Sequence, residues 1–148
     1  MDGRERRGFR LENVFLANEI NQSRLTEMLF NGLFHINGES FNMEVINYTI
    51  PLNNIEIWSI FNQSAIAHPF HIHDIQFNIL EINGAAPPLH MQGWKDILLI
   101  PGHQGNAKFI AKFDDFADAN VPFMYHCHML VHEDEGMMGQ FTVVEHDN

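Results

Sequence analysis

Residues 126–138 read HCHMLVHEDEGMM, and residues 68–73 read HPFHIH. In the first stretch the only cysteine of the chain, Cys127, stands between two histidines. A further histidine, His132, and a methionine, Met137, follow the cysteine at five and ten residues. A thiolate, imidazoles and a thioether together are the ligands of blue-copper electron-transfer sites. The two stretches therefore predict a copper protein.

Strand alternation divides these ligand types between two faces. Successive side chains of a strand point to opposite faces of its sheet. If both stretches are extended, the cysteine points away from its two flanking histidines, and the first histidine of HPFHIH points away from the other two. One predicted site would then contain His68, Cys127, His132 and Met137, and the other would contain His71, His73, His126 and His128.

The two stretches resemble the copper motifs of the last cupredoxin domain of multicopper oxidases, the family of laccases, bilirubin oxidases and bacterial cuprous oxidases. The similarity extends through residues 35–41 (HINGESF), 93–96 (GWKD) and 141–143 (FTV), and covers about residues 30–145. It implies an all-β fold, a Greek-key cupredoxin β-sandwich or barrel, with copper as the cofactor. No motif position is substituted, which argues against a metal-free relative.

Carried over by position, the resemblance assigns a copper type to each ligand. The type 1 copper ligands are His68, Cys127, His132 and Met137. The type 2 ligand is His71, and the ligands of the type 3 pair are His73, His126 and His128. The oxygen-reducing site of the family uses eight histidines, four from this last domain and four from two His-x-His motifs of the first domain. This chain has no other His-x-His, so one copy cannot complete the three-copper cluster.

The ligand types also suggest a route for electrons. A reductant near an exposed edge of His68 or His132 would give single electrons to the type 1 site. Cys127 and the adjacent backbone would pass them to His126 and His128. In a complete family enzyme, such electrons reduce O2 to water.

Two acidic residues are weaker candidates for roles near the predicted sites. Glu133, directly after His132, would relay protons toward the oxygen site, or would be one solvated acid in the run of residues 133–135. Asp96 would orient a ligand histidine, or would be an ordinary strand or turn carboxylate.

Length and composition agree with one globular domain. The chain has 148 residues and a net charge of −11, which disfavours nucleic acid as a partner. No apolar run approaches the length that spans a bilayer, and MDGRERRGFR lacks the apolar core of a signal peptide. The parent family is typically periplasmic or secreted. We predict a lead-in at residues 1–30 and a cupredoxin domain at residues 31–148.

Short alternating segments between turn signals predict the strands. The turn signals include Asn37-Gly38 and Asn83-Gly84. Residues 19–30 are compatible with a short helix or with an irregular lead-in to the first strand. We expect strands at residues 41–50, 55–62, 74–82, 97–101, 108–113, 123–126 and 139–144.

Three functional hypotheses follow. The first is the C-terminal domain of a laccase-like oxidase, which couples one-electron oxidation of a small reducing substrate to O2 reduction and needs the remaining cupredoxin domains as partners. The second is a stand-alone blue-copper electron carrier or copper-binding module. The third is a homo-oligomer in which a second copy of the chain completes the three-copper cluster. We expect the isolated chain to lack oxidase activity unless it assembles in this way.

Overall fold

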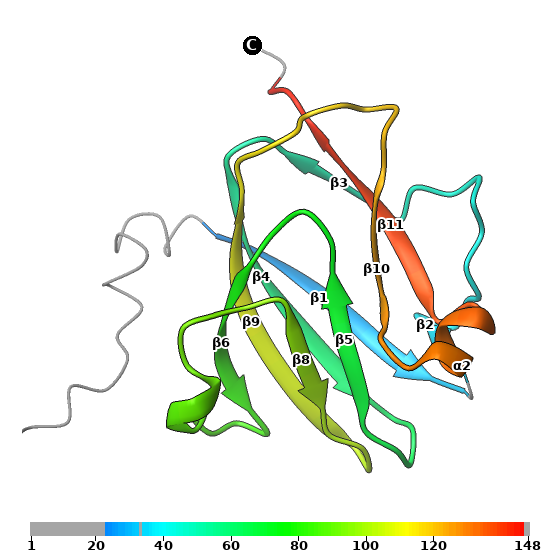
Figure 1. The fold of residues 1–148 in the computed structure, drawn as a ribbon, viewed down its shortest axis with the longest axis vertical. Helices are drawn as coiled ribbons and strands as arrows, with labels where there is room; N and C mark the ends of the chain where they lie inside the picture. Colours follow the sequence, from blue (N-terminus) through cyan, green and yellow to red (C-terminus); the bar gives the residue numbers. More distant parts are fainter. Residues whose placement is uncertain (1–22, 33, 147–148) are drawn as a thin grey trace, which may run out of the picture.

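The computed structural model describes residues 23–32 and 34–146, which form two β-sheets (Figure 1). The strands of the first, sheet A, are β1 (Arg24–Asn31), β2 (His35–Ile36), β4 (Asn54–Asn62), β6 (Phe77–Ile82), β7 (Trp94–Lys95) and β9 (Gly105–Phe113). The strands of the second, sheet B, are β3 (Tyr48–Pro51), β5 (His68–Ile72), β8 (Ile97–Ile100), β10 (Phe123–Cys127) and β11 (Met138–Val144). A 3-10 helix, η2 (Leu89–Met91), and a short α-helix, α2 (Leu130–Asp134), lie in loops.

The strand order is β2-β1-β4-β9-β6-β7 in sheet A and β3-β11-β10-β5-β8 in sheet B. Strand β1 is parallel to β4, and β3 is parallel to β11, whereas the other pairs are antiparallel. The predicted all-β cupredoxin sandwich is confirmed. Within the described part of the chain, no helix is long and apolar enough to cross a membrane.

The core lies between the sheets and is centred on Trp58 of β4, which is fully buried. Six aromatic rings from both sheets surround the indole at centroid distances of 5.3–6.4 Å: Tyr48, Phe70, Phe109, Phe113, Tyr125 and Phe141. Rings at this spacing attract one another beyond the effect of area burial alone. Phe109 and Phe113 of β9 share a face of the strand, and both point to this core.

Two tight turns were correctly predicted from their Asn-Gly pairs. Both residues of Asn37-Gly38 and of Asn83-Gly84 have positive φ angles, between 49° and 80°. Such turns match the twist of antiparallel strands, and asparagine and glycine tolerate the left-handed backbone best. Each pair is closed by an isolated bridge, Ile36 with Glu39 and Ile82 with Ala85.

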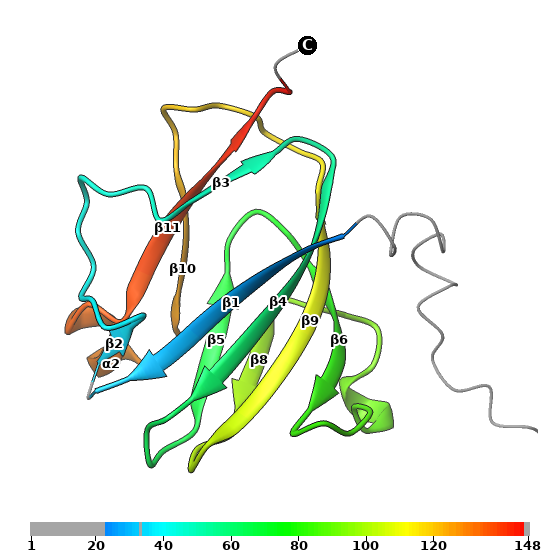
Figure 2. The same ribbon diagram turned by 180° about the vertical axis from the view of Figure 1, so that it is seen from behind.

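Strand β1 occupies much of residues 19–30, for which the sequence was compatible with either a short helix or an irregular lead-in. It lies beside β4 in sheet A (Figure 2) and pairs with it from Arg24 to Phe30, so neither alternative describes it. A buried carboxylate ties the two strands together. Glu56 of β4 accepts hydrogen bonds from Thr26 and Trp58 at 3.1 Å and pairs with Arg24. Residues 19–22 lie outside the described residues.

Two predicted strands begin later along the chain than expected. Residues 41–47 do not pair with a neighbouring strand. The side-chain amide of Gln140 instead donates hydrogen bonds to the backbone carbonyl oxygens of Met43 and Val45, at 2.9 and 2.8 Å. The segment predicted at 74–82 becomes a strand only at Phe77, since Asp74 has a φ of 75° that a strand does not accommodate.

Strands β5 and β10 lie side by side in the middle of sheet B. Their antiparallel register sets Cys127 opposite Phe70 and His126 opposite His71. The core face of β5 carries His68, Phe70 and Ile72, all buried. The two strands that contain the motif residues are therefore direct neighbours, as the two-face interpretation requires.

Candidate metal centre

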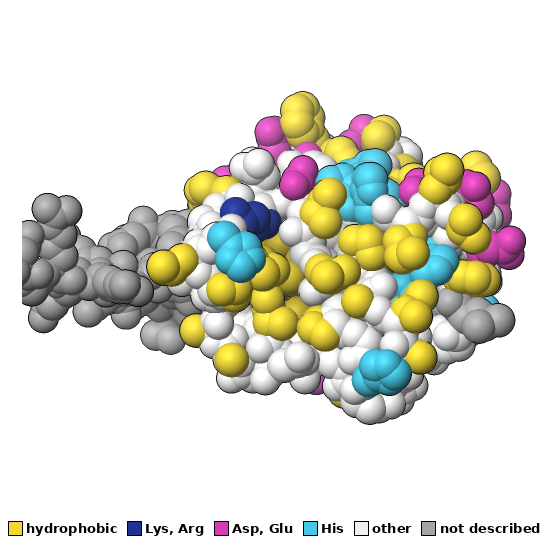
Figure 3. All heavy atoms as spheres, turned by 60° about the horizontal axis from the view of Figure 1, so that its bottom comes forward, with side chains coloured by type: hydrophobic (Ala, Val, Ile, Leu, Met, Phe, Trp, Pro, Cys, Tyr) yellow, Lys and Arg dark blue, Asp and Glu magenta, His cyan; other side chains and the backbone are white. Residues whose placement is uncertain are grey.

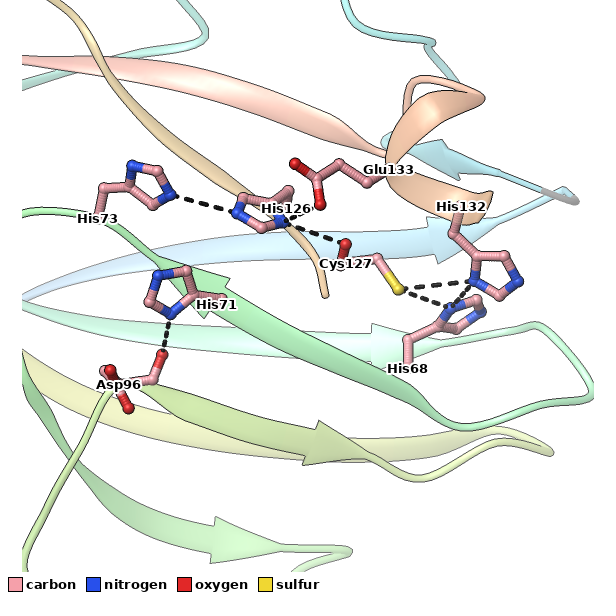
Figure 4. A network of polar contacts seen from close by, with 8 residues as sticks. All are labelled: His68, His71, His73, Asp96, His126, Cys127, His132 and Glu133. Carbon is pink, nitrogen blue, oxygen red and sulfur yellow. Dashed lines mark hydrogen bonds and ion pairs between the residues drawn. The ribbon is translucent and has the colours of Figure 1, made fainter. Parts of the chain in front are cut away.

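His68, Cys127 and His132 converge on the core side of sheet B, and we call this group the cysteine site (Figure 4). The Nδ1 atoms of the two histidines are 3.1 Å apart. The Cys127 sulfur lies 3.4 Å from Nδ1 of His68 and 3.5 Å from Nδ1 of His132. All three residues are buried. They come from strand β5, the end of strand β10 and helix α2.

The cysteine site passes a geometric test for a trigonal metal ion. The point equidistant from the Cys127 sulfur and the two Nδ1 atoms of His68 and His132 lies about 1.9 Å from each of them. This distance is near the metal–nitrogen length of about 2.0–2.1 Å. The donor set of two imidazoles and one thiolate is the equatorial set of blue-copper proteins. The residues present therefore fit copper.

Met137 is held beside this group through its backbone. Its N–H donates to the carbonyl of His132 at 3.0 Å, and its carbonyl accepts from the N–H of Cys127 at 3.0 Å. The Met137 side chain is buried in the core cluster that includes Cys127. These two backbone hydrogen bonds place Met137 next to the predicted ligands Cys127 and His132.

Four histidines gather on the opposite, outer side of sheet B, and we call them the histidine face. Its members are His71, His73, His126 and His128. Neighbouring rings have centroid separations of 5.1–5.5 Å. Nε2 of His73 and Nε2 of His126 are 3.2 Å apart. The structure thus brings all four together, as the alternation of side chains predicts.

In His71 and His126, oxygen atoms lie next to Nδ1, which leaves Nε2 as the nitrogen that can bind a metal. Nδ1 of His71 lies 2.7 Å from the backbone carbonyl oxygen of Asp96 and can only donate to it. Nδ1 of His126 lies 3.1 Å from the Cys127 carbonyl oxygen and 3.4 Å from a Glu133 oxygen. A ring nitrogen that donates a proton fixes the tautomer and frees the other nitrogen for a metal.

The two acidic candidates differ in how they contact the histidines. Asp96 orients His71 through its backbone oxygen, whereas the prediction considered its carboxylate. Glu133 is one-third exposed, and its carboxylate points toward His126.

The expectation of an exposed edge on His68 was wrong. The side chain is 1% exposed, and its Nε2 atom lies 2.7 Å from the hydroxyl of Ser64. Ser64 was not among the predicted residues, since a serine in a polar loop carries no distinctive sequence signal. His132 is also buried, at 7% exposure, and the ring of Phe34 packs against it at 4.8 Å.

Burial controls protonation at the cysteine site. Burial, and to a smaller extent the charge of the neighbouring His132, lowers the pKa of His68 to about 4. Burial raises the pKa of the Cys127 thiol, a backbone hydrogen bond at Met129 lowers it, and the charge of Glu133 raises it. Near neutral pH the thiol therefore carries its proton, and metal binding must release it.

The family model described as "Multicopper oxidase" matches residues 9–147 of the chain. The chain belongs to the multicopper oxidase family. It is 41% identical over 113 residues to multicopper oxidase mco of Staphylococcus haemolyticus, covering 73% of this chain and 24% of that protein. It is 31% identical over 113 residues to a laccase of Bacillus stratosphericus, covering 64% of this chain and 21% of that protein. Copper is therefore the expected cofactor.

Solved structures of multicopper oxidases share the fold. The laccase-like multicopper oxidase CueO from Ochrobactrum sp. matches with a TM-score of 0.75 and 38% identity, covering 84% of this chain and 31% of that chain. A multicopper oxidase from Pediococcus acidilactici matches with a TM-score of 0.77 and 30% identity, covering 84% of this chain and 27% of that chain. The chain thus spans about a quarter of the length of its curated relatives.

The low pKa of His68 predicts acid sensitivity of the copper-free chain. The unfolded state, with a histidine pKa of 6.5, binds more protons than the folded state between pH 6.5 and about 4. The free energy of unfolding therefore falls as the pH drops, by about 2 kcal/mol between pH 7 and pH 5. Urea unfolding at the two pH values measures this loss.

The His68→Gln variant is the control for this pH effect. Its free energy of unfolding should depend less on pH across the same range, because its side chain does not titrate. Equal stability of the copper-free wild type at pH 7 and pH 5 would contradict the prediction.

Proposed function

We propose that the chain is the C-terminal cupredoxin domain of a laccase-like multicopper oxidase. One observation carries the proposal: the cysteine site and the histidine face lie on opposite sides of the same strand pair, β5 and β10. In this proposal Met137 completes a type 1 copper site with the cysteine site. His71 binds type 2 copper, and His73, His126 and His128 bind the type 3 pair.

Bound copper would supply one-electron oxidation of a small reducing substrate and, at a completed cluster, reduction of O2 to water. Cys127 joins the two sites covalently, since it is flanked in sequence by two histidines of the opposite face. The buried rings of His68 and His132 keep water away from the sulfur. Together these residues form a dry, short path for electron transfer.

Glu133 is suited to move protons at the histidine face. Its carboxylate oxygen lies 3.4 Å from Nδ1 of His126, and its side chain is 33% exposed. It can therefore accept a proton from solvent and hold it next to a ligand histidine. This position supports the proton-relay role over that of an unconnected surface acid.

The histidine face requires a partner, because it supplies only half of the ligands that the family's three-copper cluster needs. Figure 3 shows histidine side chains exposed among hydrophobic ones on this surface. Strand β8 adds Ile97 directly opposite His71 and Leu99 opposite Pro69, and both of these β8 side chains are exposed. We assign this surface to the remaining cupredoxin domains of the parent oxidase, in a periplasmic or secreted protein.

A second copy of the chain is the alternative partner. His73 and His128 are exposed, and two such faces would together offer eight imidazoles. A stand-alone electron carrier is less consistent with the structure, because a carrier has no use for a second group of four converging histidines.

Copper titration of the purified chain, followed by absorption, metal counting and sedimentation, tests the proposal. We expect an intense blue thiolate-to-copper band that saturates at one copper per monomer, with little O2 uptake. A blue band with about five coppers per dimer and O2 uptake would favour the self-assembled oxidase. A folded chain without a blue band in excess copper would refute the assignment of type 1 copper.

A further inference from the structure

A chain of hydrogen bonds runs from the rear of His68 into the protein. Nε2 of His68 lies 2.7 Å from Oγ of Ser64. The same Oγ lies 2.7 Å from Oδ1 of Asn62. Asn62 is the last residue of β4, and its side chain is fully buried. A buried asparagine at the end of a strand is costly unless its amide is fully satisfied, so its partners are informative.

The amide of Asn62 can adopt only one orientation. Its nitrogen faces three backbone carbonyl oxygens, those of Ile66 at 2.9 Å, Pro101 at 3.1 Å and Ile100 at 3.4 Å. An amide oxygen in that position would meet only other acceptors, so the nitrogen must be there. Oδ1 therefore faces Ser64, and it also accepts from the Ser64 backbone N–H at 3.0 Å.

The fixed amide sets the direction of the serine hydroxyl. Ser64 has one hydroxyl proton, and the acceptors near it are Oδ1 of Asn62 at 2.7 Å and the carbonyl oxygen of Ile66 at 3.0 Å. If the Ser64 hydroxyl donates its proton to one of these two acceptors, its oxygen can only accept a hydrogen bond from Nε2 of His68. Nε2 of His68 then carries a proton, and Nδ1 directs its lone pair at the cysteine site.

We infer that Ser64 and Asn62 are positioning residues that hold His68 in the tautomer with a proton on Nε2 and a free Nδ1. The inference rests on the proposed function in assigning Nδ1 of His68 to the metal. Ser64 contacts His68 at Nε2, on the other side of the ring from Nδ1, and Asn62 acts through Ser64. Their effect passes through the imidazole, whose orientation and basicity depend on the acceptor behind it.

Nitrogen NMR of the copper-free chain tests the tautomer directly. In the wild type the 15N shifts of His68 should show a proton on Nε2. In Ser64→Ala this preference should weaken, and in Ser64→Thr, which retains the hydroxyl, it should persist. A proton on Nδ1 in the wild type, or an unchanged tautomer in Ser64→Ala, would overturn the inference. This readout needs no metal, so it decides the inference even if the copper assignment fails.

Copper binding provides the second readout. Competition titration should show a 10- to 100-fold lower copper affinity for Ser64→Ala, the usual effect of losing a hydrogen-bond partner behind a ligand. The reduction potential should also shift, whereas Ser64→Thr should resemble the wild type. Ser59→Ala removes a serine hydroxyl from the outward face of strand β4, is the matched control and should change neither quantity. Wild-type affinity and potential in Ser64→Ala would count against the inference.

Discussion

The Cys127→Ser variant should lose the blue absorption of the copper-loaded chain completely. Cys127 provides the only sulfur in the triangle formed with His68 and His132, at 3.4 and 3.5 Å from their nitrogens. The intense band of a blue-copper site arises from its thiolate, which a hydroxyl cannot replace. Absorption spectra of both proteins at saturating copper measure the effect.

The His73→Asn variant is the control for this result. His73 belongs to the histidine face and is exposed, so its loss should leave the blue band intact. Circular dichroism of both copper-free variants would show that each is folded. A full blue band in Cys127→Ser would mean that the chromophore lies elsewhere.

Trp58→Ala should destabilise the copper-free chain by about 4 kcal/mol. The indole is 0% exposed, and six aromatic rings from both sheets surround it. Its removal opens a cavity between the sheets and leaves a hydrogen-bond acceptor of Glu56 without its indole donor. Urea unfolding at pH 7 gives the difference in the free energy of unfolding.

The second tryptophan offers a matched comparison. Trp94 lies in the edge strand β7 and is 51% exposed, so Trp94→Ala should cost about 1 kcal/mol or less. Similar losses for the two variants would show that Trp58 is not the centre of the core.

The assembly of the two ligand groups was predictable because strand geometry has a fixed period of two. His71 and His73 share a face, and His68 points away, whatever the surrounding loops do. The positions of Cys127 and its neighbours follow from the same rule. For the ligands on β5 and β10, tertiary contacts did not have to be known, since these strands needed only to be extended and adjacent, whereas His132 lies in helix α2 and is not covered by the rule.

Strand β1 was harder to predict because its apolar residues are spaced like those of a helix. The apolar side chains at positions i, i+3 and i+4, which are Leu25, Met28 and Leu29, would also lie on one side of a helix. The structure shows that Leu25 is 56% exposed and lies on the outer side of sheet A, while Met28 faces the core. The ion pair that links half-exposed Arg24 of β1 to buried Glu56 of β4 depends on a residue far along the sequence.

The contacts behind the ligands could not be predicted for a similar reason. Ser64 matters because the amide of Asn62 is held by carbonyl groups of residues up to 39 positions away. Likewise, the segment at 41–47 departs from a strand because of Gln140, which follows it by almost a hundred residues. Local propensity contains no information about such partners.

The shared strand pair restricts how this chain can tolerate insertions and deletions. Loops that contain no ligand can lengthen without moving either ligand group, unlike the connection between β10 and β11, which contains His132 and Met137. A single residue inserted between Phe70 and His71 would instead turn the side chains on one side of the insertion to the other face of the sheet, so that His68, His71 and His73 would all point to the same face. Only changes that preserve the parity of β5 and β10 can therefore be accepted without losing both sites at once.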